Sequence, residues 1–228
     1  MSGAHRPWPF RPGQTPLDLR LDLRVGATAA YPAGIDDLAP MSLRPDDALA
    51  GGLVTVEPLE EGHREGLRAA ADEDPAIWRW MAYDGNFDRW FDDALDSGRD
   101  VTFAVVRDGR IGGSTRYLSY EPAHRRVEIG WTWLRPSEWN TGANVETKLL
   151  LLEHAFERCG LQRVEFKTDA RNERTRGALL ALGAQFEGIA RKHMMLPSGP
   201  RDSAWYAVTE DDWPEVKARL LWRLELKK

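Results

Sequence analysis

The amino-acid sequence predicts an α+β fold, in which helices lie on both faces of a mixed, mostly antiparallel sheet. Two observations predict it. Three short strands joined by tight turns span residues 101–134, as in an antiparallel meander. A helix, a strand and a second helix then follow up to residue 182. Such an alternation is typical of a crossover connection that adds a parallel neighbour to the sheet.

The composition excludes several classes of protein. The chain has 228 residues, with 31 Lys and Arg, 36 Asp and Glu, a net charge of −5 and a mean hydropathy of −0.51. A mildly acidic chain lacks the basic surface that general nucleic-acid binding needs. Its single cysteine, Cys159, excludes an internal disulfide framework and a cysteine-based zinc site. No apolar run is long enough for a membrane span or a secretory signal, so we expect a cytoplasmic protein.

Residues 1–50 differ from the rest of the chain and are predicted to form an N-terminal extension, either flexible or docked as an edge strand. They are rich in Gly, Ala and Pro, and only residues 17–24 alternate as a short strand would. Met41 is a second candidate start of translation. We expect residues 51–228 to form one domain.

The first elements of that domain are a strand and three helical pieces. The strand is predicted at 53–56 and ends before Pro58, and the helical pieces are predicted at 61–72, 75–82 and 87–96. In the first helix the apolar residues share one face, and charged residues occupy the others.

The meander consists of strands at 101–106, 111–120 and 127–134. Asp108 and Gly109 join the first two, because both tolerate the positive φ of a hairpin turn. Alternation predicts that one set of apolar residues shares a face of the third strand: Val127, Ile129, Trp131 and Trp133.

The second half of the chain alternates between helices and strands. Helices are predicted at 144–159 and 172–182, on either side of a strand at 163–169. Gly160 and Gly183 suit the left-handed position that follows a helix. A hairpin of strands 185–195 and 203–209 and a last helix complete the domain. The apolar stripe of the last helix is Trp213, Val216, Leu220 and Leu224.

Two helix starts are the strongest candidates for a binding site. One follows the strand that ends at Leu134 and contains Gly142, and the other begins near Asn172. The first amides of a helix have no internal partner, so such a turn can cradle a phosphate or pyrophosphate. The alternative is that Asn144 and Asn172 are ordinary helix caps. Because the two preceding strands should be neighbours, both helix starts would lie at one edge of the sheet, where ligands bind in such folds.

The sequence resembles the GNAT acetyltransferase superfamily, in its RimJ/RimL-like branch, over about residues 53–210. Four features carry the resemblance in their order and spacing: residues 129–134, the loop to Gly142, the helix through residues 153–157, and residues 172–175 with 182–184. The resemblance implies a sheet whose central strands splay apart, acetyl-CoA as co-substrate and N-acetyltransferase activity.

The resemblance also implies residues that bind acetyl-CoA. The backbone at Trp133 and Leu134 would bind the pantetheine arm, and Asn172 matches an asparagine that contacts the same arm. The phosphate loop would be formed by Trp139, Asn140, Thr141, Gly142, Ala143 and Asn144. This loop departs from the family pattern of Gln/Arg-x-x-Gly-x-Gly/Ala, because Trp139 takes the first position and Asn144 the last.

The family often has a tyrosine that protonates the leaving sulfur, and Leu179 stands at that position here. Because a thiol has a pKa of about 8.5, a thiolate can leave without a strong acid. Thr175 could donate a hydrogen bond to the sulfur instead. The alternative role of Thr175 is that of a first-turn helix residue.

Glu128 is the candidate general base, because it lies on the strand that should face the acyl group. The alternative is that Glu128 pairs across strands with an arginine such as Arg116 or Arg125. An α-amine has a pKa of about 7.7–8.0 and a lysine side chain one of about 10.4, so an α-amine needs the weaker base. An amide of the same strand could stabilise the developing oxyanion.

The acceptor is expected to enter between the helical pieces at 75–96 and the closing hairpin. Trp80, Tyr83 and Asp84 are the candidate wall residues, and the acidic Asp84 would attract a cationic amine. For Trp78 and Trp90, packing within the helical pair is the better interpretation. The histidines are scattered without the spacing of a metal site, so no metal ligands are predicted.

The sequence therefore predicts an N-acetyltransferase that acts by direct attack in a ternary complex, with a protein or peptide N-terminal amine as acceptor. A small-molecule amine such as a drug or polyamine is the alternative acceptor. A non-catalytic acyl-CoA-binding sensor is the alternative of another class. We expect a monomer or a homodimer that binds neither nucleic acid nor membrane.

Overall fold

The computed structural model describes residues 43–81, 83–98 and 100–227. The chain divides into two units, residues 1–39 and 40–228, and every described residue belongs to the second. The predicted strand at 17–24 and Met41 lie outside the described residues. The part of the predicted extension that is described, residues 43–50, contains the buried Leu43 and a strand of two residues.

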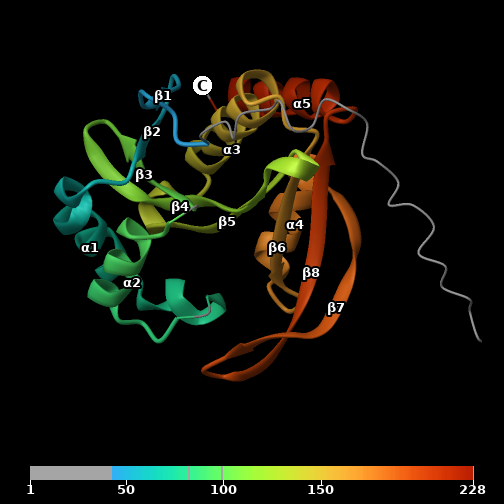
Figure 1. The fold of residues 1–228 in the computed structure, drawn as a ribbon. Coiled ribbons are helices and arrows are strands. Elements are labelled where there is room, and N and C mark those ends of the chain that lie inside the picture. Colours follow the sequence, from blue (N-terminus) through green and yellow to red (C-terminus); the bar gives the residue numbers. More distant parts are fainter. Residues whose placement is uncertain (1–42, 82, 99, 228) are drawn as a thin grey trace, which may run out of the picture. The chain divides into compact units, whose positions relative to one another are not determined.

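The described residues form an eight-stranded sheet in the order β1-β2-β3-β4-β5-β6-β8-β7 (Figure 1). Only β5 and β6 pair in parallel, and every other neighbouring pair is antiparallel, which confirms the predicted mixed sheet. The strands are β1 (Leu49–Ala50), β2 (Thr55–Pro58), β3 (Val101–Arg107), β4 (Arg110–Glu121), β5 (Arg126–Leu134), β6 (Arg163–Asp169), β7 (Gln185–Leu196) and β8 (Gly199–Thr209).

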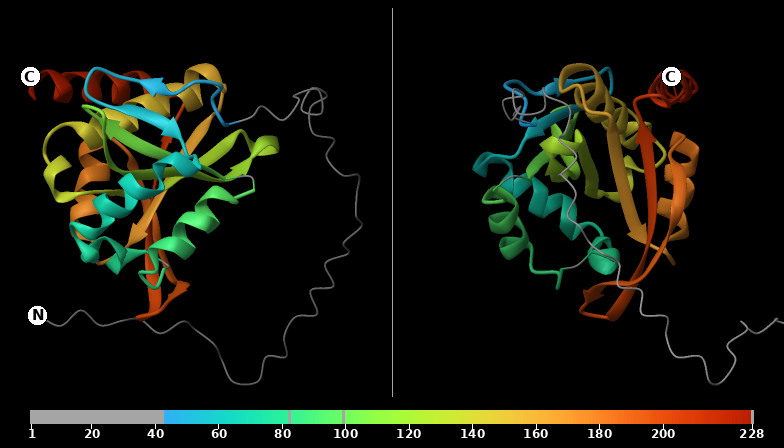
Figure 2. Two further views of the ribbon diagram at one scale, coloured as in Figure 1. Left: turned by 90° about the vertical axis from the view of Figure 1, so that its left-hand side faces the viewer. Right: turned by 45° about the vertical axis from the view of Figure 1, so that its right-hand side comes forward.

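Helices cover both faces of the sheet, as predicted. They are α1 (Arg64–Asp72), α2 (Phe87–Leu95), α3 (Ala143–Glu153), α4 (Glu173–Leu182) and α5 (Trp213–Glu225). The predicted helix at 75–82 is a 3-10 helix, η2 (Pro75–Trp80), and α3 continues into one π-helical segment (His154–Arg158). Figure 2 shows α1 and α2 beside each other, apart from the adjacent α3 and α5. No helix among the described residues is long and apolar enough to cross a membrane.

Each face has its own hydrophobic cluster. The larger cluster packs beneath α3, α4 and α5 and includes the whole predicted stripe of the last helix and the buried Cys159. The smaller cluster packs beneath α1 and α2 and is aromatic, with Trp90, Phe91 and Trp133 at its centre. Trp78 packs against this smaller cluster, as predicted for Trp78 and Trp90.

The predicted common face of Val127, Ile129, Trp131 and Trp133 is wrong. Val127 and Ile129 lie in the larger cluster, whereas Trp133 lies in the smaller one with Trp131 packed against it. The cause is a β-bulge, because Arg116 pairs with Gly130 but Ser114 pairs with Trp133. The extra residue in β5 adopts φ +50° at Trp131 and moves the following side chains to the other face.

The pairing of β5 with β6 is short, and the strands separate at the edge of the sheet where the candidate site lies. Only residues 126–128 of β5 pair with residues 163–165 of β6, and beyond Glu128 the two strands separate. Their carboxyl ends lead into the starts of α3 and α4 (Figure 1). The splayed central strands and the shared edge of the two helix starts are therefore confirmed.

Candidate functional site

The loop before α3 is fixed by Gly142. This residue is the N-cap of α3 and has φ +100°, a conformation that disfavours any side chain. A Cβ atom at Gly142 would also lie 2.9 Å from Leu53 Cδ1. The Thr141 hydroxyl donates to the Glu138 carbonyl at 2.9 Å and accepts from the Ala143 amide at 3.2 Å. The helix thus begins one residue before the predicted start, and Asn144 is not its cap.

The first turn of α3 has free donors. The Glu146 amide donates to the Gly142 carbonyl at 2.9 Å, which closes the first helical hydrogen bond. Among the described residues, the amides of Asn144 and Val145 have no acceptor. Two free amides, the positive end of the helix dipole and a glycine without a side chain form a cradle that can accept an anionic group such as a phosphate.

Trp139 links the loop to α4. Its indole nitrogen donates to the Leu134 carbonyl at 2.8 Å, at the end of β5. The guanidinium carbon of Arg174, in the first turn of α4, lies 4.1 Å from the centre of the indole ring. A cation therefore lies beside the phosphate loop even though Trp139 replaces the polar residue of the family pattern. Arg174 is not predicted from the sequence, because no local pattern indicates that a side chain of α4 packs on the ring of Trp139.

Glu146 holds the start of α3 to the connection between β1 and β2. Its carboxylate accepts hydrogen bonds from the amides of Gly52 at 2.9 Å, Leu53 at 2.6 Å and Val54 at 2.6 Å. The side chain is buried. Three amides around one carboxylate form a charge-assisted anchor, which positions the phosphate loop from outside the loop itself.

The start of α4 is capped by Asn172, as the structural alternative predicted. Its side-chain oxygen accepts from the Thr175 amide at 3.1 Å, and the Asn172 side chain is buried. Asp169, at the end of β6, accepts two side-chain hydrogen bonds from Arg171 at 2.8 and 2.9 Å. The cap engages only the oxygen of the Asn172 amide group, so its NH₂ group can still donate to a ligand.

Glu128 is buried, with 2% of its surface exposed, and its carboxylate lies 2.8 Å from Lys167 Nζ. Burial raises the pKa of Glu128, and the positive charge of Lys167 acts against that rise. The structure shows the cross-strand ion pair of the alternative interpretation, but with Lys167 as partner, because Arg116 faces Asp100 and Arg125 donates to the Gly160 carbonyl. The parallel register of β5 and β6 instead places Lys167 on the face of Glu128.

Of the predicted wall residues, Trp80 lies where η2 meets the closing hairpin, whereas Tyr83 and Asp84 contact β5 and α2. Arg201 of β8 donates to the Trp80 carbonyl at 3.3 Å, so η2 and the hairpin are adjacent, as predicted. The Tyr83 ring packs edge-on against Trp131 at 5.9 Å. Asp84 forms an ion pair with Arg89 of α2 at 3.1 Å, so its charge is offset by the helix that follows its loop.

Lys148 is a buried cation that the sequence analysis missed. Its Nζ donates to the Thr132 hydroxyl at 2.6 Å and the Thr115 hydroxyl at 3.3 Å, on the two strands that form the bulge. Among the described residues no carboxylate pairs with it. Burial lowers the pKa of Lys148 to about 7. The helical period gave no sign of it, because α3 is buried on most of its circumference.

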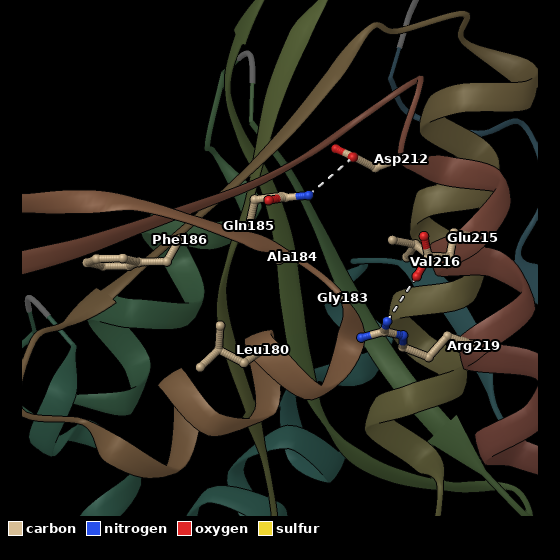
Figure 3. A pocket seen from close by; sticks show the side chains of 9 residues that line it. All are labelled: Leu180, Gly183, Ala184, Gln185, Phe186, Asp212, Glu215, Val216 and Arg219. Carbon is tan, nitrogen blue, oxygen red and sulfur yellow. Dashed lines mark hydrogen bonds and ion pairs between the residues drawn. The ribbon is translucent and has the colours of Figure 1, made fainter.

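A surface pocket of about 300 Å³ lies elsewhere, between α4, β7 and α5 (Figure 3). A hydrogen bond from Gln185 to Asp212 and an ion pair of Arg219 with Glu215 cross it. It contains none of the residues predicted to bind acetyl-CoA or the acceptor. We assign it no part in the site.

Comparison with known proteins agrees with this geometry. Residues 54–185 match the family model described as an acetyltransferase (GNAT) domain. The uncharacterized N-acetyltransferase YoaA of Bacillus subtilis (strain 168) is 29% identical over 98 residues, which cover 43% of this chain and 55% of YoaA. The chain thus matches about half the length of that curated relative.

Solved structures share the fold. A protein from T. thermophilus, whose acetyltransferase assignment is itself inferred, is 37% identical with a TM-score of 0.71, covering 78% of this chain and 97% of that one. A GCN5-related N-acetyltransferase from Brucella melitensis is 29% identical with a TM-score of 0.73, covering 79% and 87%. Mycobacterium smegmatis RimJ, in complex with CoA-disulfide, is 20% identical with a TM-score of 0.65 and covers 77% and 91%.

Proposed function

Because the chain belongs to the GNAT acetyltransferase family, we propose that it transfers the acetyl group of acetyl-CoA to a primary α-amine, at the N-terminus of a protein or peptide. The observation that carries this proposal is the buried carboxylate of Glu128. Glu128 lies on β5, the strand that leads to the phosphate cradle, and forms an ion pair with Lys167 of β6. It is a fixed base beside the point where β5 and β6 separate.

The two helix starts would hold acetyl-CoA. The amides of Asn144 and Val145, with the loop residues Asn140, Thr141, Gly142 and Ala143, would bind the pyrophosphate. The backbone of Trp133 and Leu134 and the NH₂ group of Asn172 would bind the pantetheine arm. Arg174 and Trp139 would flank the phosphates. When bound, acetyl-CoA supplies an acetyl group activated as a thioester.

The chain's own groups then accept the amine proton and stabilise the charge that develops during transfer. The amine nitrogen forms a bond to the acetyl carbonyl carbon, the carbon–sulfur bond breaks, and its electron pair leaves on the sulfur. Glu128 accepts the amine proton, directly or through a water molecule. An amide of β5 donates to the carbonyl oxygen as it gains charge. Thr175 can donate a hydrogen bond to the sulfur. Leu179, at the position of the family's tyrosine, has no group that could donate one.

The strength of this base favours an α-amine over a lysine side chain. Roughly a tenth of an α-amine with a pKa near 7.7–8.0 is neutral at pH 7, against about one part in several thousand of a lysine side chain. Burial raises the pKa of Glu128, and Lys167, which shares the carboxylate, limits that rise, so the base keeps the modest strength of a carboxylate. A weak base suffices only for the acceptor that loses its proton easily.

Thermal unfolding with acetyl-CoA, CoA and ATP tests the first half of the proposal. A ligand at one hundred times its dissociation constant stabilises by about 2.7 kcal/mol, and in a chain of this size that is a shift of roughly 5–10 °C. We expect shifts with acetyl-CoA and CoA but not with ATP. No shift with either CoA ligand would contradict the proposed site.

Product analysis by mass spectrometry tests the second half. We expect acetylation of a peptide α-amine at a higher rate than acetylation of spermidine or of a lysine side chain in an N-terminally blocked peptide. Preferential acetylation of spermidine would identify a small-molecule enzyme instead. Binding of acetyl-CoA with no product from any amine would identify a sensor.

A further inference from the structure

Arg201 is a buried arginine that forms no ion pair with any carboxylate in the part of the chain that the structure describes. Its exposed fraction is 6%, yet its only hydrogen bond among the described residues goes to the Trp80 carbonyl at 3.3 Å. Its Nε atom is fully buried and has no acceptor. Among the described residues, no carboxylate lies within ion-pair distance of its guanidinium. An arginine keeps its proton in proteins, so this charge cannot be lost by titration.

The nearby carboxylates are already engaged. The two that act on Arg201 are Asp169 and Glu128. Asp169 is held by two hydrogen bonds from Arg171, and Glu128 is held by Lys167. Lys167 and Arg171 thus hold these two carboxylates, and Arg201 makes no hydrogen bond or ion pair with either of them. A buried charge without a partner is unfavourable unless a ligand provides the counterion.

Arg116 shows the contrast on the other side of Glu128. It is also buried, with an unpartnered Nε atom, but Asp100 lies 4.0 Å from its Nη1 atom and its guanidinium lies 5.1 Å from the Trp131 ring. Arg201 has a carbonyl partner alone. The unmet charge therefore belongs to the side of the site formed by β8 and η2.

This side is also where the acceptor is expected. The carbonyl that Arg201 contacts belongs to Trp80, a predicted wall residue. The charge of Arg201 reaches the Glu128 carboxyl, which is the proposed base. An acceptor whose amine approaches Glu128 would thus have its neighbouring atoms near a guanidinium.

We propose that Arg201 is a specificity-determining residue that binds an anionic group of the acceptor, a carboxylate close to the reacting amine. A guanidinium can bind a carboxylate through two parallel hydrogen bonds. Such a ligand would provide hydrogen-bond acceptors for the N–H groups of Arg201. The inference rests on the proposed function and names its substrate class. The carboxylate can belong to an acidic side chain near a peptide N-terminus, or to a free amino acid, in which case the acceptor is an α-amine of a small molecule and not of a protein. A polyamine would bring a second cation to a guanidinium that lacks an anionic partner among the described residues.

Matched acceptors test the proposal. Acetyl transfer to glycine is compared with transfer to glycinamide, and transfer to a peptide with Glu at its second position is compared with the same peptide carrying Gln. We expect the acidic member of at least one pair to have the higher kcat/KM, although the amide's amine loses its proton more easily. The pair that shows the preference identifies the source of the carboxylate. Equal or higher kcat/KM for the neutral member of both pairs would overturn the proposal.

The variant Arg201→Gln isolates the residue. We expect it to lower the ratio of kcat/KM for the acidic acceptor over the neutral one roughly 10- to 100-fold, as the loss of a charged hydrogen bond does. Arg201→Lys keeps the charge and should recover part of the loss. Arg191→Gln, an exposed change of equal charge on β7, is the matched control. An equal loss for acidic and neutral acceptors in Arg201→Gln would overturn the proposal.

A binding measurement separates this inference from the proposed function. N-acetylglycine and N-acetylglycinamide, or the corresponding acetylated peptides, are added to the protein, and the unfolding temperature is recorded. We expect the acidic compound to raise it in the original protein but not in Arg201→Gln. This shift would support the anion site even if no transfer were seen. Acetylation of neutral amines without such a shift would overturn the anion site and leave the transferase proposal standing.

Discussion

Two cations are buried in this domain without a carboxylate partner among the described residues. A buried charge without a partner is unfavourable, and the two side chains differ in whether they can lose that charge. Lys148 lies between α3 and the sheet and donates to two threonine hydroxyls. Arg201 lies between the sheet and η2 and donates to one carbonyl. Lysine can release its proton, and burial lowers the pKa of Lys148 to about 7. Arginine cannot do so.

The difference assigns different roles to the two faces. On the face of α3, a lysine that can become neutral joins Thr115 of β4 to Thr132 of β5 at the bulge and needs no ligand. On the face of η2, a permanent charge stays in place beside the proposed base. The first is a feature of a finished core, and the second is a feature of a binding site that a ligand completes.

The largest expected effect comes from Glu128, the carboxylate nearest to the proposed chemistry. Glu128→Gln should lower kcat for an α-amine by about 10²–10⁴-fold, because a general base contributes about that much. Steady-state kinetics with a peptide acceptor measures it. Glu165→Gln is the matched control, since Glu165 is a buried neighbour paired with Arg126 and Arg163. A comparable loss in both variants would mean that the local charge pattern, and not a base, sets the rate.

Stability against pH sharpens the comparison of the two cations. The pKa of Lys148 is lower in the folded than in the unfolded chain, so between about pH 7 and 10.5 the unfolded state binds more protons. Lys148 therefore makes the free energy of unfolding rise with pH across that window, and its cost is fully present below pH 7. Arg201 stays protonated in both states and gives no such slope.

The variants Lys148→Met and Arg201→Met test this difference in how the two cations make stability depend on pH. At pH 6 we expect Lys148→Met to be more stable than the original protein by on the order of 1–3 kcal/mol, after the loss of two hydrogen bonds. That gain should shrink as the pH rises to 9.5, whereas any gain in Arg201→Met should stay constant. Urea unfolding at three pH values measures both. If the change in the free energy of unfolding depended equally on pH in the two variants, the contrast between Lys148 and Arg201 would be wrong.

A smaller effect is expected from the anchor of α3. Glu146→Gln replaces a carboxylate that accepts from three amides with a group that has one acceptor oxygen, so we expect a loss of about 1–3 kcal/mol in the free energy of unfolding. Affinity for acetyl-CoA should fall with it, because the anchor positions the phosphate cradle. Calorimetric titration with CoA checks this. Unchanged affinity in a destabilised variant would separate the anchor from the cradle.

The smallest effect is expected from Arg174, an exposed cation beside the cradle. Arg174→Gln should raise KM for acetyl-CoA about two- to fivefold at low ionic strength, since an exposed charge contributes up to about 1 kcal/mol. The difference should vanish at 1 M salt, where the Debye length is about 3 Å. Arg158→Gln, an exposed change beyond the other end of α3, should leave KM unchanged at either salt concentration.

Much of the fold could be predicted from the sequence because its signals are local. The Asp108-Gly109 turn, the Asn172 cap, and the stripe from Trp213 to Leu224 each depend on neighbours within a few residues. The mixed sheet followed from the order of such elements.

The site resisted prediction where it depends on distant strands. The bulge at Trp131 comes from the register of β5 against β4, so strict alternation placed Trp131 and Trp133 on the wrong face. The partner of Glu128 comes from the register of β5 against β6. Arg174 and Arg201 reach the site across gaps in the sequence of more than thirty and more than a hundred residues, to Trp139 and Trp80.

The dependence of acetyl transfer on pH, in the original protein and in Glu128→Gln, tests the central claim most directly. The rate with a peptide acceptor is measured from pH 5 to 9 and divided by the neutral fraction of its α-amine. Since burial raises the pKa of Glu128, the corrected rate of the original protein should fall toward acid pH as the carboxylate becomes protonated. It should not fall in Glu128→Gln. The same acid limb in both proteins would contradict the assignment of Glu128 as the base.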